Sequence, residues 1–225
     1  MTDFMQNLGA DTRQFKFTDV WGLDPVRFDG DRDLLAMIEG PVLAVILLFP
    51  IGDAKGEDTR LGTPVTNALE GPYYMKQTIQ NACGTIAVLH AVLNNRDFVA
   101  SEPDSFLDKF YTATKDMDPE SRGAFLENPP SGDLNIETCH KAAALAGSTA
   151  PPAAADDVDL HFVAFVHSGG RLFELDGRQR GPIDHSATSL ETLLQDTAET
   201  VKRTRLAGSD SLNFSLIALS ARGDE

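Results

Sequence analysis

The sequence predicts one domain of the α/β or α+β class that spans residues 1–225. The chain is long enough for one substantial core, and its content of 42% apolar and 24% charged residues is ordinary for a globular protein. Helical apolar patterns fall on either side of several strand-like runs. At least two of those runs, joined by Gly169 and Gly170, are expected to pair antiparallel.

The first elements follow from apolar patterning. Residues 2–8 predict a short helix that ends at Gly9, and residues 15–21 alternate as a short strand. Residues 34–38 fit neither pattern. Residues 41–49 are continuously apolar, which predicts a strand buried on both faces. This run is far shorter than the roughly 20 residues that a membrane span requires.

The middle of the chain is predicted to be helical. Residues 83–93 show a helical apolar pattern whose one face consists of Ile86, Leu89, His90 and Leu93. Further helices are expected at residues 104–115, 119–127 and 135–146. Residues 147–159 are rich in small residues and proline, which is typical of a linker or of a mobile functional loop.

The last third of the chain predicts a hairpin, a helix and a strand. Residues 160–167 and 171–176 are strand-like runs on either side of the two glycines. Residues 190–203 predict an amphipathic helix with an apolar side made of Leu190, Leu193, Leu194, Ala198 and Val201. Residues 212–219 predict the closing strand.

The charge and the N-terminus narrow the possible functions. The chain has 34 acidic and 19 basic residues, a net charge of −15, which argues against nucleic acid as a partner. This charge favours either a partner with a basic face or simply solubility. The first residues carry no basic or apolar signal region, so we expect a cytoplasmic or also nuclear protein with reduced cysteines and no membrane partner.

Cys83 is the first candidate for a nucleophile. It directly precedes a helical pattern, and a thiol at a helix N-terminus faces unpaired backbone N–H groups that favour the thiolate. Gly84 leaves room beside the sulfur for a substrate backbone. The alternative is that Cys83 is a small buried apolar residue. Cys139, inside a predicted helix, has no such setting and is interpreted as structural.

His161 and Asp176 are the candidate partners of this thiol. If Gly169 and Gly170 form a two-residue turn, Val163 lies opposite Asp176 and both point to the face that carries His161. Asp176 is then diagonal to His161 and can accept a proton from its imidazole. A three-residue turn would place the two side chains on opposite faces. The spacing therefore favours a Cys-His-Asp site only in one register.

The other histidines have ordinary structural interpretations. His90 is expected to be a hydrogen-bonded core residue, His140 a helix-surface residue and His167 a solvent-facing residue. His185 is interpreted as a loop residue that caps a neighbour. No pair has the spacing of a zinc site, and we expect neither a metal nor a cofactor.

Several segments together resemble one family. Residues 77–86 (QTIQNACGTI) resemble the active-site segment of ubiquitin carboxyl-terminal hydrolases. Residues 160–166 (LHFVAFV) and 172–178 (LFELDGR) resemble the histidine and aspartate segments of that family, in the same order. Further matching segments are residues 19–25, 41–50, 182–185 and 213–220.

The resemblance implies a role for each site residue. Cys83 is implied to be the nucleophile and His161 the general base and then acid, with Asp176 orienting the imidazole. Gln77 is implied to donate its amide to the oxyanion, beside the backbone N–H of Cys83. We also expect Leu212, Asn213 and Phe214 to contact the substrate.

The resemblance further implies a fold and a substrate. The fold is a papain-like cysteine peptidase core with a knotted backbone and a mainly antiparallel sheet between helices. The substrate is the C-terminal glycine of ubiquitin, or of the related modifier NEDD8, joined to a small or flexible adduct. Residues 147–159 are implied to cross over the active site, and the enzyme is expected to be monomeric.

One departure from the family and two alternatives remain. The chain begins inside the first helix of the family, so either the sequence is truncated at this edge or this member binds ubiquitin with less help there. Because the chain stops shortly after the last predicted strand, we expect a stand-alone catalytic domain. One alternative is another papain-like Cys-His-Asp enzyme, such as an acyl transferase. The other is a ubiquitin-binding module without catalytic activity.

Overall fold

The computed structural model describes residues 1–23, 34–51, 62–65, 71–134, 136, 160–207 and 213–222. Its helices and strands are α1 (Thr2–Asn7), β1 (Phe15–Val20), η1 (Leu35–Met37), β2 (Val42–Pro50), β3 (Thr63–Pro64), α2 (Cys83–Leu93), α3 (Phe106–Thr114), α4 (Pro119–Glu127), η2 (Gly132–Leu134), β4 (Leu160–Ser168), β5 (Arg171–Leu175), β6 (Ile183–Ala187), α6 (Leu193–Val201), η3 (Lys202–Leu206) and β7 (Ser215–Ala221). Within these ranges no helix has the length and apolar character to cross a membrane.

The strands form one seven-stranded sheet in the order β1-β7-β2-β4-β5-β6-β3, and every neighbouring pair is antiparallel. β2 lies between β7 and β4, and its residues from Val42 to Leu47 are buried. The prediction of a strand buried on both faces is therefore confirmed. The mixed α/β class is also confirmed, whereas the knot that the resemblance implies stays a prediction.

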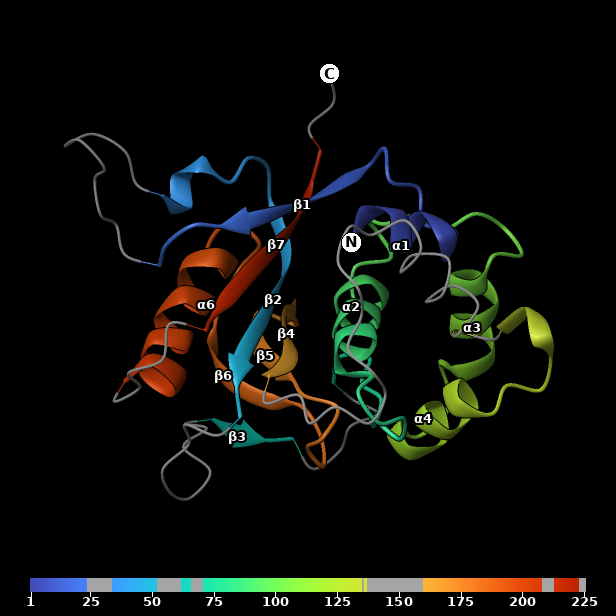
Figure 1. Cartoon of the computed structure of the whole chain (residues 1–225). Helices are drawn as coiled ribbons and strands as arrows, with labels where there is room; N and C mark the ends of the chain where they lie inside the picture. Colours follow the sequence, from blue (N-terminus) through green and yellow to red (C-terminus); the bar gives the residue numbers. More distant parts are fainter. Residues whose placement is uncertain are drawn as a thin grey trace.

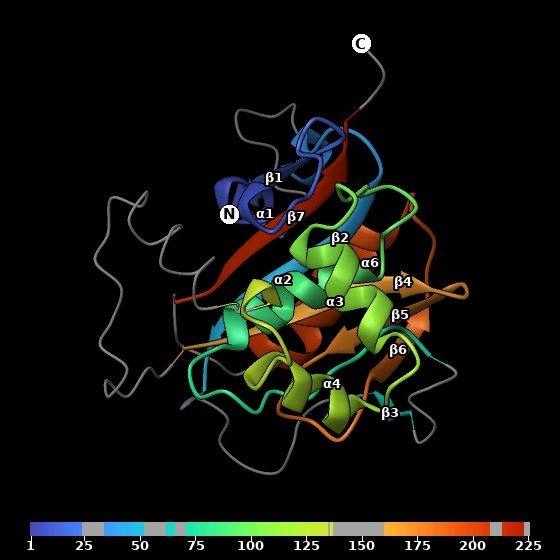
Figure 2. The same cartoon turned by 90° about the vertical axis from the view of Figure 1, so that its right-hand side faces the viewer.

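Two apolar cores cover the two faces of the sheet. Figure 1 shows α2, α3 and α4 on one side and α6 on the other, and Figure 2 gives the view turned by 90°. Along β4 the side chains alternate: Ala164 and Val166 join the core under α2, whereas Val163 and Phe165 join the core under α6. This alternation allows one strand to serve both cores.

α2 has the predicted bounds, but its surroundings differ from the prediction. Its residues from Thr85 to Leu93 are all buried, so the helix has no solvent-facing side. It packs on β2 and β4 while α3 and α4 lie on its outer side (Figure 1). A helix that is enclosed in this way is apolar on all sides, so the prediction of a single apolar face captured only part of its buried surface. His90 is a hydrogen-bonded core residue, as predicted: its Nε2 accepts from the N–H of Met75 at 3.0 Å.

The helix predicted at residues 190–203 differs from the structure at both ends. Leu190 precedes α6 and packs against the α2-side core, because the chain turns over residues 190–192 before the helix begins. At the other end, the α-helix stops at Val201 and a π-helical turn, η3, follows. The remaining apolar positions of the prediction lie in the α6-side core. The helix predicted at residues 135–146 lies outside the described residues, apart from Ile136.

His185 is not the loop residue that was predicted. It lies on β6, and its side chain is fully buried beside the equally buried carboxylate of Glu174 on β5. One oxygen of Glu174 is 2.9 Å from Nε2 of His185, and the other is 2.5 Å from Nη2 of Arg205 on η3. The guanidinium of Arg205 also lies 4.9 Å from the ring centre of Phe49. These contacts join β2, β5, β6 and η3 at one buried ionic cluster.

Removing one partner from this cluster is expected to destabilise the fold. In Arg205→Met the carboxylate of Glu174 stays fully buried and loses its guanidinium, so we expect the free energy of unfolding to fall by about 3 kcal/mol in urea denaturation. Arg203→Met, on the same turn but exposed, is the control and should change it by less than about 0.5 kcal/mol. Equal losses in both variants would contradict a stabilising role for the cluster.

Candidate active site

The N-terminus of α2 presents Cys83. Ala82 is the N-cap residue and offers no side-chain hydrogen bond, so no side chain of the cap competes for the first N–H groups of the helix. Asn81 has a φ of 56°, in the left-handed region that asparagine tolerates better than most residues. This turn brings the chain into the helix with Cys83 as its first residue. The thiol is half-buried.

The hairpin has the register that the prediction required. Ser168 pairs with Arg171, and Gly169 and Gly170 have φ values of 55° and 77°. A two-residue turn with positive φ at both positions is the favoured hairpin connection, because its twist matches that of the strands. The pair Ala164–Leu175 then places the next residues on each strand, Val163 and Asp176, opposite each other.

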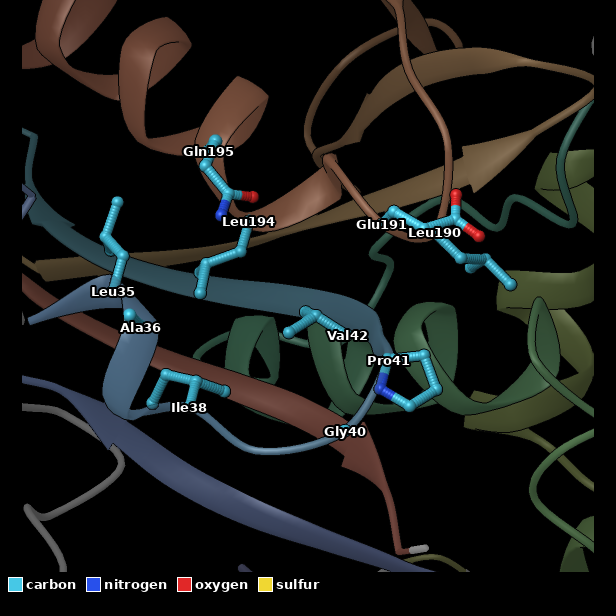
Figure 3. Close-up of a pocket in the computed structure, with 10 residues that line it drawn as sticks. All are labelled: Leu35, Ala36, Ile38, Gly40, Pro41, Val42, Leu190, Glu191, Leu194 and Gln195. Carbon is cyan, nitrogen blue, oxygen red and sulfur yellow. The ribbon is translucent and has the colours of Figure 1, made fainter. Parts of the chain in front are cut away.

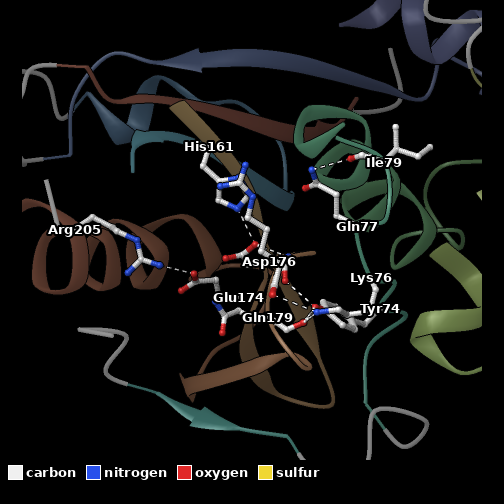
Figure 4. Close-up of polar contacts among 10 residues, drawn as sticks. Tyr74, Lys76, Gln77, Ile79, His161, Glu174, Asp176, Gln179 and Arg205 are labelled. Carbon is white, nitrogen blue, oxygen red and sulfur yellow. Dashed lines mark hydrogen bonds and ion pairs between the residues drawn. The ribbon is translucent and has the colours of Figure 1, made fainter. Parts of the chain in front are cut away.

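His161 and Asp176 form a buried hydrogen bond. Nε2 of His161 lies 2.7 Å from Oδ1 of Asp176, and the two residues are 3% and 1% exposed. Oδ1 also accepts from the backbone N–H of Arg178 at 2.9 Å. On another side of the imidazole, the ring of Phe49 packs edge-to-face at 5.7 Å. The ring orientation is thus fixed by an acid and by an aromatic neighbour, as Figure 4 shows for the acid.

Cys83 and His161 shift the pKa of each other. Burial raises the pKa of the Cys83 thiol, but its interactions with His161, the backbone N–H of Phe162 and the charge of Arg178 outweigh burial and leave this pKa below its ordinary value. Burial lowers the pKa of His161, but Asp176 and Cys83 outweigh it and leave this pKa raised. Both pKa shifts act in the direction of a thiolate beside an imidazolium.

Nδ1 of His161 is the ring atom left for chemistry. It is buried, and in the described part of the chain no group meets the distance and angle criteria for a hydrogen bond with it. Since Nε2 is bound to Asp176, Nδ1 is the nitrogen through which His161 interacts with the thiol. Catalytic hydrogen bonds of this kind often tighten only when substrate is bound.

Gln77 lies against the loop that carries Asp176. Its N–H donates to the carbonyl of Gly177 at 2.8 Å, and a Cβ added to Gly177 would lie 3.0 Å from Cβ of Gln77. Glycine is needed at this close approach. The side-chain Nε2 of Gln77 donates to the carbonyl of Ile79 at 3.0 Å, which occupies one of its two hydrogens. Oε1 is buried and has no partner among the described residues.

The other predicted residues have different places. Phe214 packs against the α6-side core and Asn213 is exposed, whereas Leu212 lies outside the described residues. Cys139, His140 and the predicted crossover at residues 147–159 also lie outside them. Their predicted roles stay predictions.

Two contributors to the site were missed by the sequence reasoning. The N–H of Phe162 and the charge of Arg178 both lower the pKa of Cys83. No side-chain pattern could have revealed a backbone N–H. Arg178 lies in a segment that resembles the family, yet its spacing from Asp176 gave no reason to assign it an electrostatic role.

A separate pocket lies between η1, the start of β2 and the N-terminal part of α6 (Figure 3). Its volume is about 380 Å³, and Leu35, Ile38, Val42 and Leu194 are among the residues that line it. None of the lining residues belongs to the predicted catalytic set. In the described residues there is also no group of three or more His, Cys, Asp or Glu side chains that could hold a metal ion.

Comparison with known proteins gives consistent results. Residues 1–207 match the family model described as ubiquitin carboxyl-terminal hydrolase, family 1. Ubiquitin carboxyl-terminal hydrolase 3 of Arabidopsis thaliana is 40% identical over 99% of this chain and 90% of its own length. Human ubiquitin carboxyl-terminal hydrolase isozyme L1 is 35% identical over 92% and 87% of the two chains.

Among solved structures, the chain resembles the UCH37 catalytic domain of Trichinella spiralis, a structure with bound ubiquitin vinyl methyl ester. The TM-score is 0.71 at 22% identity, and the match covers 98% of this chain and 91% of the other. At this identity the likeness shows a shared fold.

The thiol of Cys83 is expected to react at a pH at which ordinary cysteines are protonated. Because its pKa is lowered, the thiolate persists below the ordinary pKa of a cysteine and is lost only as the pH falls through the lowered value. The measurement is the pH dependence of alkylation by iodoacetamide, followed peptide by peptide in a mass spectrometer.

Asp176→Asn is expected to shift this profile toward an ordinary cysteine, because the imidazolium loses its counter-charge. Cys139 provides the comparison within the same sample. Identical profiles for the two cysteines would contradict the ion pair.

Proposed function

The chain belongs to ubiquitin carboxyl-terminal hydrolase family 1, a family of cysteine peptidases, and we propose that Cys83, His161, Asp176 and Gln77 cleave the bond after the C-terminal glycine of ubiquitin. The observation that carries this proposal is the buried His161–Asp176 hydrogen bond beside a helix N-terminal thiol of lowered pKa. It supplies a nucleophile, a proton carrier and an orienting acid in one place.

The reaction begins with the thiolate. The sulfur of Cys83 attacks the glycine carbonyl carbon, and the electron pair of the C=O bond moves onto the oxygen. When this intermediate collapses, the bond to the leaving amine breaks and the imidazolium of His161 gives its Nδ1 proton to the amine. A thioester between ubiquitin and Cys83 remains, together with a neutral imidazole.

Water then completes the cycle. Nδ1 of His161 takes a proton from a water molecule, which attacks the thioester carbonyl. Collapse breaks the C–S bond and restores the thiolate beside the imidazolium, while the new carboxyl group of ubiquitin gives its proton to solvent and leaves as the carboxylate. Throughout both steps Asp176 holds Nε2, so that Nδ1 carries the mobile proton.

The oxyanion is stabilised by Gln77 and by the backbone N–H of Cys83 in this proposal. Nε2 of Gln77 has a second hydrogen beyond the one donated to Ile79, and a donor of this kind is worth about 3 kcal/mol in the transition state. The hydrogen bond to Ile79 also restricts the side chain before substrate arrives, which lowers the entropy cost of using it.

The finer substrate assignments follow from chemistry. A substrate that ends in glycine suits this site, because Gly84 adjoins the thiol and leaves little spare room. A Cβ added to Gly84 would lie 3.4 Å from the ring of Phe162. The net charge of −15 favours encounter with a modifier that presents a basic face. Both ubiquitin and NEDD8 meet these two conditions, so turnover of the two modifiers carrying the same fluorophore is the measurement that ranks them. We expect a monomeric enzyme.

The central test is hydrolysis of ubiquitin that carries a fluorogenic amide at its C-terminus. The wild type should release the fluorophore and Cys83→Ala should release none, because no other side chain replaces the nucleophile. If neither releases it while both bind ubiquitin, the binding-module alternative is favoured. If neither binds ubiquitin, the substrate assignment is wrong, and an acyl transferase or another papain-like activity becomes the better explanation.

Gln77→Ala tests the oxyanion role. Since the lost interaction exists only in the transition state, kcat and kcat/KM are expected to fall together by about 100-fold, with an unchanged pH profile of Cys83 alkylation. Gln80→Ala, three residues away and exposed, is the control. A rise in KM at constant kcat would assign Gln77 to binding instead.

A further inference from the structure

The loop after β5 receives hydrogen bonds from three residues of one neighbouring segment. Residues 176–179 present four consecutive backbone carbonyls, and each accepts a hydrogen bond from Tyr74, Lys76 or Gln77. The loop already closes on itself through the N–H of Gln179 and the carbonyl of Asp176 at 2.8 Å. The additional donors therefore exceed what a turn needs to form.

Lys76 provides the charged part of this contact. Its Nζ donates to the carbonyl of Arg178 at 3.2 Å and also to the carbonyl of Gln179. An ammonium group has three donors and prefers oxygen dipoles that point at it. The side chain is half-buried, so these carbonyls replace part of its hydration. Figure 4 shows Lys76 and Tyr74 beside Gln179.

Tyr74 contributes a buried, well-fixed hydroxyl to this contact. Its hydroxyl lies 2.7 Å from the carbonyl of Asp176 and 2.6 Å from that of Gln179, so one proton is shared between the two ends of the loop. The residue is fully buried, and its ring stacks on His90 with centres 5.2 Å apart. Nη1 of Arg122 donates to its backbone carbonyl at 2.8 Å. The ring and the backbone of Tyr74 are therefore both held in place, which fixes the position of its hydroxyl.

The contact connects two parts of the proposed site. Asp176 is bound at both ends, with its carbonyl at Tyr74 and its carboxylate at His161. Gln77, the proposed oxyanion donor, directly follows Lys76 and binds the carbonyl of Gly177. The segment that carries Gln77 thus sets the position of the loop that carries Asp176.

We propose that Tyr74 and Lys76 are positioning residues of the hydrolase, which hold the Asp176 loop against the Gln77 segment and thereby keep His161 oriented toward Cys83. This inference rests on the proposed function for its effect on turnover. Its effect on the thiol does not, since the Cys83–His161 interaction exists without substrate. The two can therefore be tested separately.

The test compares three variants in the full chain. Lys76→Met and Tyr74→Phe each remove side-chain donors to the loop, and both should show the losses described next, whereas Lys76→Arg keeps donors. Lys76→Met keeps the length of the side chain and removes every donor, so kcat on ubiquitin fluorogenic amide should fall about 10- to 100-fold. The pH profile of Cys83 alkylation should move toward that of an ordinary cysteine. Lys76→Arg retains donors and should restore most of both properties. Lys115→Met, at an exposed lysine, is the control.

A double-mutant cycle separates positioning from general stability. If Lys76 acts through Asp176, Lys76→Met should have little further effect on the alkylation profile in an Asp176→Asn background. The proposal would be overturned if the effects of Lys76→Met and Asp176→Asn on the alkylation profile were independent of each other. It would also be overturned if Lys76→Met lowered the melting temperature and left kcat and the alkylation profile unchanged. If the profile moves as expected but no variant or wild type cleaves ubiquitin, the proposed function fails while the positioning role stands.

Discussion

The hydrogen bond between His161 and Asp176 is the contact on which the arrangement of the site depends. It joins side chains that are 15 residues apart, and it exists only because the hairpin between them turns in two residues. A slip of one residue would send one of the two side chains to the opposite face of the sheet. The positive φ values of Gly169 and Gly170, far from the thiol, therefore decide whether the imidazole has its acid.

Much of this could be predicted from the sequence because it is local. The bounds of α2 follow from a local apolar pattern, and the two glycines allowed the hairpin register that brings His161 and Asp176 together. The roles of Cys83, His161 and Asp176 were assigned from the resemblance to the family. The cluster of Glu174, His185 and Arg205 could not be predicted, because it joins three elements whose neighbourhood appears only in the folded sheet. The same reason hid the contacts of Tyr74, which lie more than 100 residues away.

β5 shows how the surroundings of a side chain separate structure from chemistry. Glu174 and Asp176 are two residues apart, so they point to the same face, and each is paired with a histidine on an adjacent strand. Residue types alone do not distinguish the two pairs. Both carboxylates are also buried.

The difference lies in what each pair meets next. The second oxygen of Glu174 is bound by Arg205, so that pair is closed by a permanent cation and can only stabilise the fold. Asp176 has different neighbours: its carboxylate accepts a backbone N–H from Arg178 and is hydrogen-bonded to His161, which in turn interacts with the thiol of Cys83. Because an imidazole can gain and lose a proton near neutral pH while a guanidinium cannot, and because His161 adjoins Cys83, the His161–Asp176 pair is the one suited to carry a reaction.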